Sequence, residues 1–163
     1  MLELLNSDET AIQTKVTRKS IIGFQNELHS MNGDVFGDSE LCPLKHSFCD
    51  GMYVREIFIP KGTYVVGKIH KHAHPNFLLK GKVKVATEEG VQILTAPLSM
   101  ISKAGTKRAL HTLEDCVWVT VHQNLSNTRD VPELVDMFTA KSYEEYDDYC
   151  KQLGGNKTNE LIN

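Results

Sequence analysis

Three histidines alternate along one short segment of the chain, which reads GKIHKHAHPNFLLKG over residues 67–81. These are His70, His72 and His74. Imidazole nitrogens bind metal ions, transfer protons near neutral pH and form hydrogen bonds, so this segment is the first place to look for chemistry. Side chains at every second position of a strand point to one face. The alternation is therefore also compatible with a polar face on a surface strand.

The cysteines supply a second candidate site, a zinc site. Cys42 and Cys49 flank His46 in the sequence CPLKHSFC, which makes a zinc clip conceivable. This spacing matches no common zinc finger, and no second ligand pair follows it. Free thiols are therefore expected at these positions, and at Cys116 and Cys150 as well.

Length and charge exclude several classes of protein. The 163 residues suit one domain that can bury a core without disulfide bonds or metal ions. With 18 basic and 21 acidic residues, the formal charge is −3, so no extended basic surface for nucleic acid is expected. No apolar run reaches the roughly 18 residues of a membrane span, and the first residues, MLELLNSDET, do not resemble a secretory signal. An intracellular protein is expected.

The chain divides into three zones. Residues 1–40 are polar with helical patches, residues 41–123 are rich in short apolar segments, and residues 124–163 are helical again. Turn signals such as Pro-Lys-Gly and Glu-Glu-Gly separate runs of about five to eight residues, which is typical of an all-β barrel or sandwich. The expected strands are MYVREIFIP, TYVVGKIH, NFLLKGKVKVAT, VQILTAP, LSMIS, KRALHTL and CVWVTVHQ.

The outer zones carry helix signals. Ser20 is expected to cap a helix in the first zone. In the last zone, Pro132 suits a first helical position. A second helix there is expected to begin with a capping box of Ser142 and Glu145 and to end at Gly154.

Residues 41–123 resemble a cupin, whose first motif is G-x5-HxH-x3,4-E-x6-G and whose second is G-x5-PxG-x2-H-x3-N. The segment LLKGKVKV resembles the cupin turn that contains the last glycine of the first motif. This resemblance implies a mainly β fold, a single cupin-type double-sheet β-barrel with N-terminal and C-terminal helical extensions. It also implies a homo-oligomer. More loosely, the chain is similar to small cupin-like proteins encoded by tailed bacteriophages, which implies a place in the host cytoplasm or in a virion.

The resemblance assigns positions to the site residues. With Gly81 as the anchor, His74 takes the glutamate position of the first motif, His70 the second histidine position and Lys68 the first. In SKAGTKRAL, Arg108 takes the histidine position of the second motif. The metal quartet of the family thus becomes two histidines and two cations, and arginine stays charged and does not ligate a metal.

Strand alternation extends this set to a predicted pocket. An unpaired buried arginine is costly, and the predicted lining contains no carboxylate, so a small anionic partner is expected. Arginine binds phosphate or carboxylate as a bidentate fork, and a tryptophan could stack on a base or a sugar, or serve only as core. The predicted ligand-binding residues are Tyr53, Arg55, Lys68, His70, His74, Asn76, Arg108, Trp118, Thr120 and His122.

Three functions stay open from the sequence. The first is a non-catalytic protein that binds a nucleotide or sugar phosphate without a cofactor, and in a phage sequesters a host signal. The second is a virion or assembly component whose helical ends make the contacts. The third is a metal-dependent cupin isomerase or oxygenase in which Tyr53 or His72 transfers protons. In that case a divalent metal would be held by His70, His74, His111 and His122.

Overall fold

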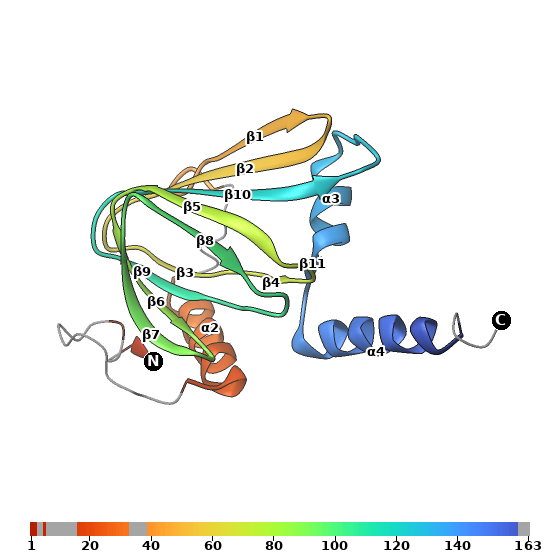
Figure 1. The fold of residues 1–163 in the computed structure, drawn as a ribbon. Coiled ribbons are helices and arrows are strands. Elements are labelled where there is room, and N and C mark those ends of the chain that lie inside the picture. The colour runs from red at the N-terminus through yellow and green to blue at the C-terminus, as the bar shows by residue number, and fades with distance from the viewer. Residues whose placement is uncertain (3–4, 6–15, 33–38, 160–163) are drawn as a thin grey trace.

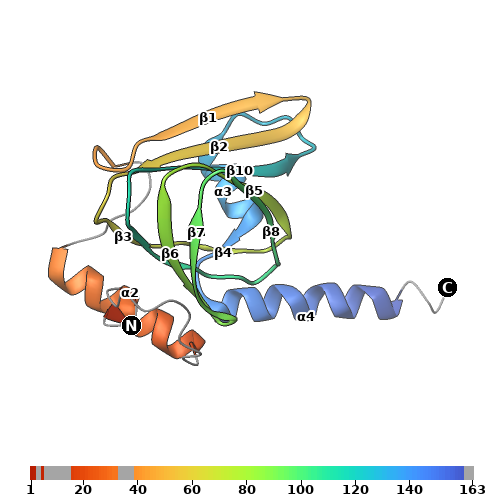
Figure 2. The same cartoon turned by 60° about the vertical axis from the view of Figure 1, so that its left-hand side comes forward.

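The computed structural model describes residues 1–2, 5, 16–32 and 39–159, which form a double-sheet barrel with helices at both ends (Figures 1 and 2). The predicted fold class is confirmed as far as a mainly β, double-sheet barrel with helical extensions. The strands are β1 (Leu44–Cys49), β2 (Gly51–Ile59), β3 (Tyr64–Val66), β4 (Ile69–His70), β5 (His74–Lys80), β6 (Lys82–Thr87), β7 (Gly90–Thr95), β8 (Leu98–Ser102), β9 (Ala109–Thr112), β10 (Cys116–Asn124) and β11 (Thr139–Ala140). The helices are α2 (Arg18–Asn32), α3 (Val131–Phe138) and α4 (Tyr143–Asn159).

Two antiparallel sheets form the barrel walls. Within the described residues, one sheet has the strand order β1-β2-β10-β5-β8 and the other has the order β3-β9-β6-β7. Alternate side chains of both sheets point inward, which is the periodicity of strands with one buried face. The buried interior cluster consists of Cys42, Ile59, Val65, Leu78, Val83, Val85, Leu94, Leu110, Cys116 and Trp118.

The turn between β5 and β6 requires a glycine. Gly81 has a φ of +91°, and a Cβ there would overlap the backbone carbonyl of Asp115 in the neighbouring turn. Only glycine adopts this conformation and allows this close approach without strain. The residue that anchors the resemblance therefore fixes the turn after the strand that carries His74 and Asn76.

Strand β1 contains most of the cysteine segment, and all four cysteines are free thiols, as expected. Residues 44–49 pair with β2 instead of forming a loop around a metal. Cys42 is fully buried in the interior, whereas Cys49 is exposed and lies on the opposite face of β1 from His46. The zinc clip is therefore not formed, because the extended strand separates its ligands.

The helical extensions differ from the prediction at their ends. Helix α2 is capped by Thr17, whose Oγ1 accepts a hydrogen bond from the backbone N–H of Ser20 at 3.2 Å. Ser20 is thus the third helical residue, and its own Oγ accepts the Thr17 N–H at 2.9 Å. Helix α4 continues through Gly154, which is not among the residues with positive φ. A glycine ends a helix only where the chain turns left-handed.

The two extensions meet beside the barrel. Arg18 of α2 makes ion pairs with Glu88 at 3.3 Å and with Asp147 of α4 at 3.1 Å, and its guanidinium lies 4.5 Å from the ring centroid of Tyr143. Further along, α4 extends away from the barrel (Figures 1 and 2). None of the helices in the described ranges combines the length and the apolar character of a membrane span.

Candidate functional site

The barrel encloses a cavity of about 760 Å³ that opens to solvent. Its wall combines apolar side chains with cations, and the described residues that line it include no Asp or Glu. The predicted residues that reach this cavity are Arg55, Lys68, His70, Asn76, Arg108, Trp118 and Thr120. The structure thus brings together side chains from six separate parts of the barrel, and their binding of a ligand stays a prediction.

Three cations contribute positive charge to the cavity. Arg55 comes from β2, Lys68 from the connection between β3 and β4, and Arg108 from the segment before β9. Burial lowers the pKa of Lys68, and the nearby charge of Arg55 lowers it further. Burial also lowers the pKa of Arg108, and the charge of Glu89 offsets part of this effect. Among the described residues, no carboxylate lies within ion-pair distance of the Arg108 guanidinium. Such a charge is stabilised when an anion enters the cavity.

A buried hydrogen-bond network fixes the position of Arg108. Its Nη2 donates to Ser102 Oγ at 2.7 Å, and that hydroxyl also accepts a hydrogen bond from Asn76 Nδ2 at 2.6 Å. Asn76 Nδ2 also donates to the carbonyl of His74 at 3.1 Å, and Asn76 Oδ1 accepts from Trp118 Nε1 at 2.9 Å. Asn76 is therefore committed to protein groups, which makes it a positioning residue rather than a ligand contact.

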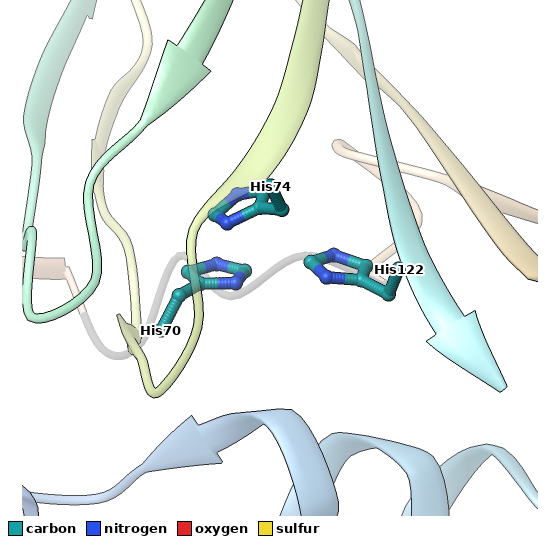
Figure 3. A group of neighbouring side chains, drawn as sticks. All are labelled: His70, His74 and His122. Atoms are coloured by element: carbon teal, nitrogen blue, oxygen red, sulfur yellow. The ribbon is translucent and has the colours of Figure 1, made fainter. Parts of the chain in front are cut away.

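Three histidines gather at one end of the site (Figure 3). His70 comes from β4, His74 from β5 and His122 from β10, and one nitrogen of each lies within 4.8 Å of the others. The ring centroids of His70 and His74 are 4.1 Å apart, and those of His70 and His122 are 5.1 Å apart. Phe138 of α3 covers the group, with its ring centroid 4.0 Å from that of His122.

The protonation of this cluster suits a metal ion. His74 Nδ1 lies 3.1 Å from the carbonyl of His72 and must donate to it, which leaves an unprotonated Nε2 in the neutral ring. That Nε2 and His70 Nδ1 are buried without a hydrogen-bond partner among the described residues. Burial lowers the pKa of all three rings, that of His122 to about 3, so they are neutral at physiological pH.

Neutral imidazoles with unused buried nitrogens fit a divalent cation such as Zn²⁺, so these three residues could hold a metal. A carbonyl that orients the ring of one ligand, as at His74, is a usual feature of such sites. The rings of His70 and His74 are stacked at an interplanar angle of 26°, and these two residues with His122 would hold the ion.

His111, the other predicted metal ligand, lies apart from this cluster. Its ring stacks on Tyr64 with centroids 4.3 Å apart, and its Nδ1 donates to the carbonyl of Leu5 at 3.0 Å. Alternation along β9 turns His111 to the outer face of the barrel, whereas Leu110 beside it faces the cavity. The structure therefore does not bring His111 together with His70, His74 and His122.

The remaining predicted residues lie around the histidines. Tyr53 is fully buried, is absent from the cavity wall and places its hydroxyl 2.6 Å from Nδ1 of His46, so the structure does not bring it to the cavity. His72 lies in the turn between β4 and β5, where its Nε2 is 3.4 Å from the hydroxyl of Tyr149 in α4. Neither residue points a free group at the cavity.

Several cavity residues were missed from the sequence. The inward alternation of LKHSFC could have identified Leu44 and His46, because both share a face of β1. No sequence signal places Val131, Pro132 and Val135 of α3 against the cavity. Their position depends on how the C-terminal zone folds back over the barrel, where Thr139 pairs with His70.

No protein-family model and no curated protein sequence matches this chain. Similar solved structures include an RmlC-like cupin from Shewanella frigidimarina, 16% identical over 60% of this chain and 83% of that chain, with a TM-score of 0.45. KdgF from Halomonas sp. is 15% identical over 60% of this chain and 87% of that chain, with a TM-score of 0.46. Ectoine synthase from P. lautus is 14% identical over 60% of this chain and 72% of that chain, with a TM-score of 0.46. At these identities and TM-scores, no property of these proteins is carried over to this chain.

Proposed function

We propose that this protein binds a small organic anion in the cavity of its barrel. The observation that carries the proposal is the combination of three cations with the absence of Asp and Glu from the described cavity wall. Arg108 supports it most directly, because its half-buried guanidinium is held by Ser102 and forms no ion pair with a carboxylate among the described residues, although the charge of Glu89 reaches it. Charge-assisted hydrogen bonds to an anion would offset the cost of burying this cation.

Replacement of Arg108 with methionine is expected to weaken anion binding at least about tenfold, since it removes charge-assisted hydrogen bonds but keeps an apolar side chain. Isothermal titration calorimetry against carboxylates, inorganic phosphate, sugar phosphates and nucleotides measures the change. Lys45→Met is the matched control, because Lys45 is an exposed cation on the outer face of β1 and should leave the affinity unchanged. If the wild-type protein binds no member of the panel, the proposal fails.

A second and compatible candidate function is metal-dependent chemistry, which the cluster of His70, His74 and His122 favours. A bound divalent metal would act there as a Lewis acid toward an oxygen of the ligand. The chain's own contribution would be to hold the imidazoles neutral and to place His70 on the cavity wall. An isomerase or oxygenase activity stays a prediction.

Protein purified without added metal is expected to retain about one divalent ion per chain, and His122→Ala is expected to lower this below about a tenth. Elemental analysis gives both ratios, and reconstitution with Co²⁺ adds a visible absorption band in the wild type. His29→Ala changes an exposed histidine of α2 and should leave the metal content intact. A wild-type protein that contains no metal and takes up none on reconstitution would exclude this candidate.

The biological setting also stays a prediction. The proposed anion binding is compatible with a phage protein that sequesters a host signal, and the exposed length of α4 is compatible with an assembly role or a homo-oligomer. Light scattering of the full chain and of a variant cut after residue 141 would test the assembly role. A monomer in both cases counts against it.

A further inference from the structure

We infer that the anion bound in the cavity has an apolar body with few hydroxyl or N–H groups, such as an aliphatic or aromatic carboxylate, and is not a sugar phosphate or nucleotide. This inference rests on the proposed function and specifies its ligand class. The inference depends on two features of the cavity wall. The first is which hydrogen-bonding groups remain available to a ligand, and the second is how much of the wall is apolar.

The wall offers many donors but few side-chain acceptors. The lining among the described residues has no carboxylate, and Asn76 Oδ1 already accepts the Trp118 N–H at 2.9 Å. Thr120 Oγ1 lies 3.1 Å from His122 Nε2, and His46 Nδ1 lies 2.6 Å from the Tyr53 hydroxyl. The oxygen of Thr120 and the unprotonated nitrogen of neutral His70 remain as side-chain acceptors. They are fewer than the hydroxyls of a sugar or the N–H groups of a base, so part of such a ligand would be buried unmatched, which costs free energy for each unmatched donor.

Apolar side chains form the rest of the wall. Ile57, Ile59 and Leu110 line it from the two sheets, and Val131 and Val135 line it from α3. Burial of apolar ligand surface against such side chains is favourable in proportion to the area removed from water. The wall thus complements a hydrocarbon body better than a hydrated sugar.

Trp118 strengthens this interpretation. Its single polar atom, Nε1, is occupied by Asn76, so its indole presents only carbon surface to the cavity. Arg55, Lys68 and Arg108 supply the charge that holds an anionic group in the same cavity. Together these features specify a ligand with one charged group and an apolar remainder.

Matched ligands test the inference on the full-length protein. Calorimetry is carried out with 3-phenylpropionate, its neutral analogue 3-phenylpropionamide, glucose 6-phosphate and uridine monophosphate. The carboxylate is expected to bind at least about tenfold more tightly than either phosphate compound, and the amide is expected to lose at least about tenfold in affinity because it lacks the charge. Val135→Ser should weaken the binding of 3-phenylpropionate, because it replaces an apolar side chain of the cavity wall. The fluorescence of Trp118 shows whether this variant is folded.

The outcomes separate the two proposals. Both the proposed anion binding and the inferred ligand class are supported if 3-phenylpropionate binds more tightly than the phosphate compounds and if this binding requires the carboxylate charge and Arg108. Tighter binding of glucose 6-phosphate or uridine monophosphate, weakened by Arg108→Met, overturns the ligand class but leaves the proposed anion binding intact. Equal binding of the acid and the amide overturns both, and so does the absence of any binding.

Discussion

Replacement of Asn76 with alanine is expected to lower the free energy of unfolding by about 3 kcal/mol, because it removes three hydrogen bonds of a buried side chain. The largest part of this loss comes from Trp118, whose Nε1–H is left without its acceptor in a buried position. Ser102 loses one of its two donors but keeps Arg108. The same substitution also frees the guanidinium to move, so anion binding should weaken as well.

Urea denaturation followed by tryptophan fluorescence measures this effect, because Trp118 is the single tryptophan of the chain and belongs to the network. Ser99→Ala is the control, since Ser99 is exposed on the outer face of β8 and should change stability by less than about 0.5 kcal/mol. A loss below about 1 kcal/mol for Asn76→Ala would show that the network does not hold the core.

A double-mutant cycle isolates the hydrogen bond to the indole. Trp118→Phe removes the donor, so the further cost of Asn76→Ala in that background should fall by at least about 1 kcal/mol. Because Trp118 is then absent, circular dichroism replaces fluorescence for the whole cycle. Additive losses in the two single variants would mean that the stability comes from packing and not from this bond.

The sequence predicted the barrel because its signals are local. Alternating apolar residues between turns identify strands, and Gly81 is needed where two turns come close together. Alternation also placed Arg108, Trp118 and Thr120 on one face, and the structure brings all three to the cavity. These inferences need only the two-residue period of a strand and one fixed point in the register.

The site was less predictable where it depends on pairing between distant segments. The metal set was predicted with His111, whose strand β9 turns it outward to Tyr64. The commitment of Asn76 to Trp118 follows from the register of β5 against β10, which no local pattern supplies. The contribution of α3 was not predictable for the same reason, since it arises from folding back across the barrel.

The two candidate functions reinforce each other electrostatically. Three neutral histidines add no negative charge to a divalent ion, and the cavity beside them already contains Arg55, Lys68 and Arg108. A bound metal would therefore increase the need for an anionic ligand instead of replacing it. Metal and anion are thus expected to bind with positive coupling, which distinguishes this site from one that balances its metal with a carboxylate ligand.

The metal-free protein is expected to lose stability as the pH falls from about 7 to about 5, by about 2 kcal/mol through His122 and by a further amount through His70, because both rings are buried in the neutral form. Burial lowers the pKa of His122 to about 3 and that of His70 well below its usual value. The unfolded chain therefore binds protons near pH 6.5 while the folded protein does not. Stability is thus present above the unfolded pKa and is lost as the pH falls below it, by about 2 kcal/mol for His122, and His70 adds to the loss in the same direction.

Urea denaturation in the presence of a chelator at pH values between about 7 and 5 measures this slope. His122→Gln should reduce the loss over the range by about 2 kcal/mol, whatever its effect on stability at neutral pH, because one buried proton acceptor is gone. His29→Gln, at an exposed position of α2, should leave the slope close to that of the wild type. A wild-type slope that His122→Gln does not reduce would mean that the pKa of His122 is the same in the folded and the unfolded chain, so that burial does not hold its ring neutral.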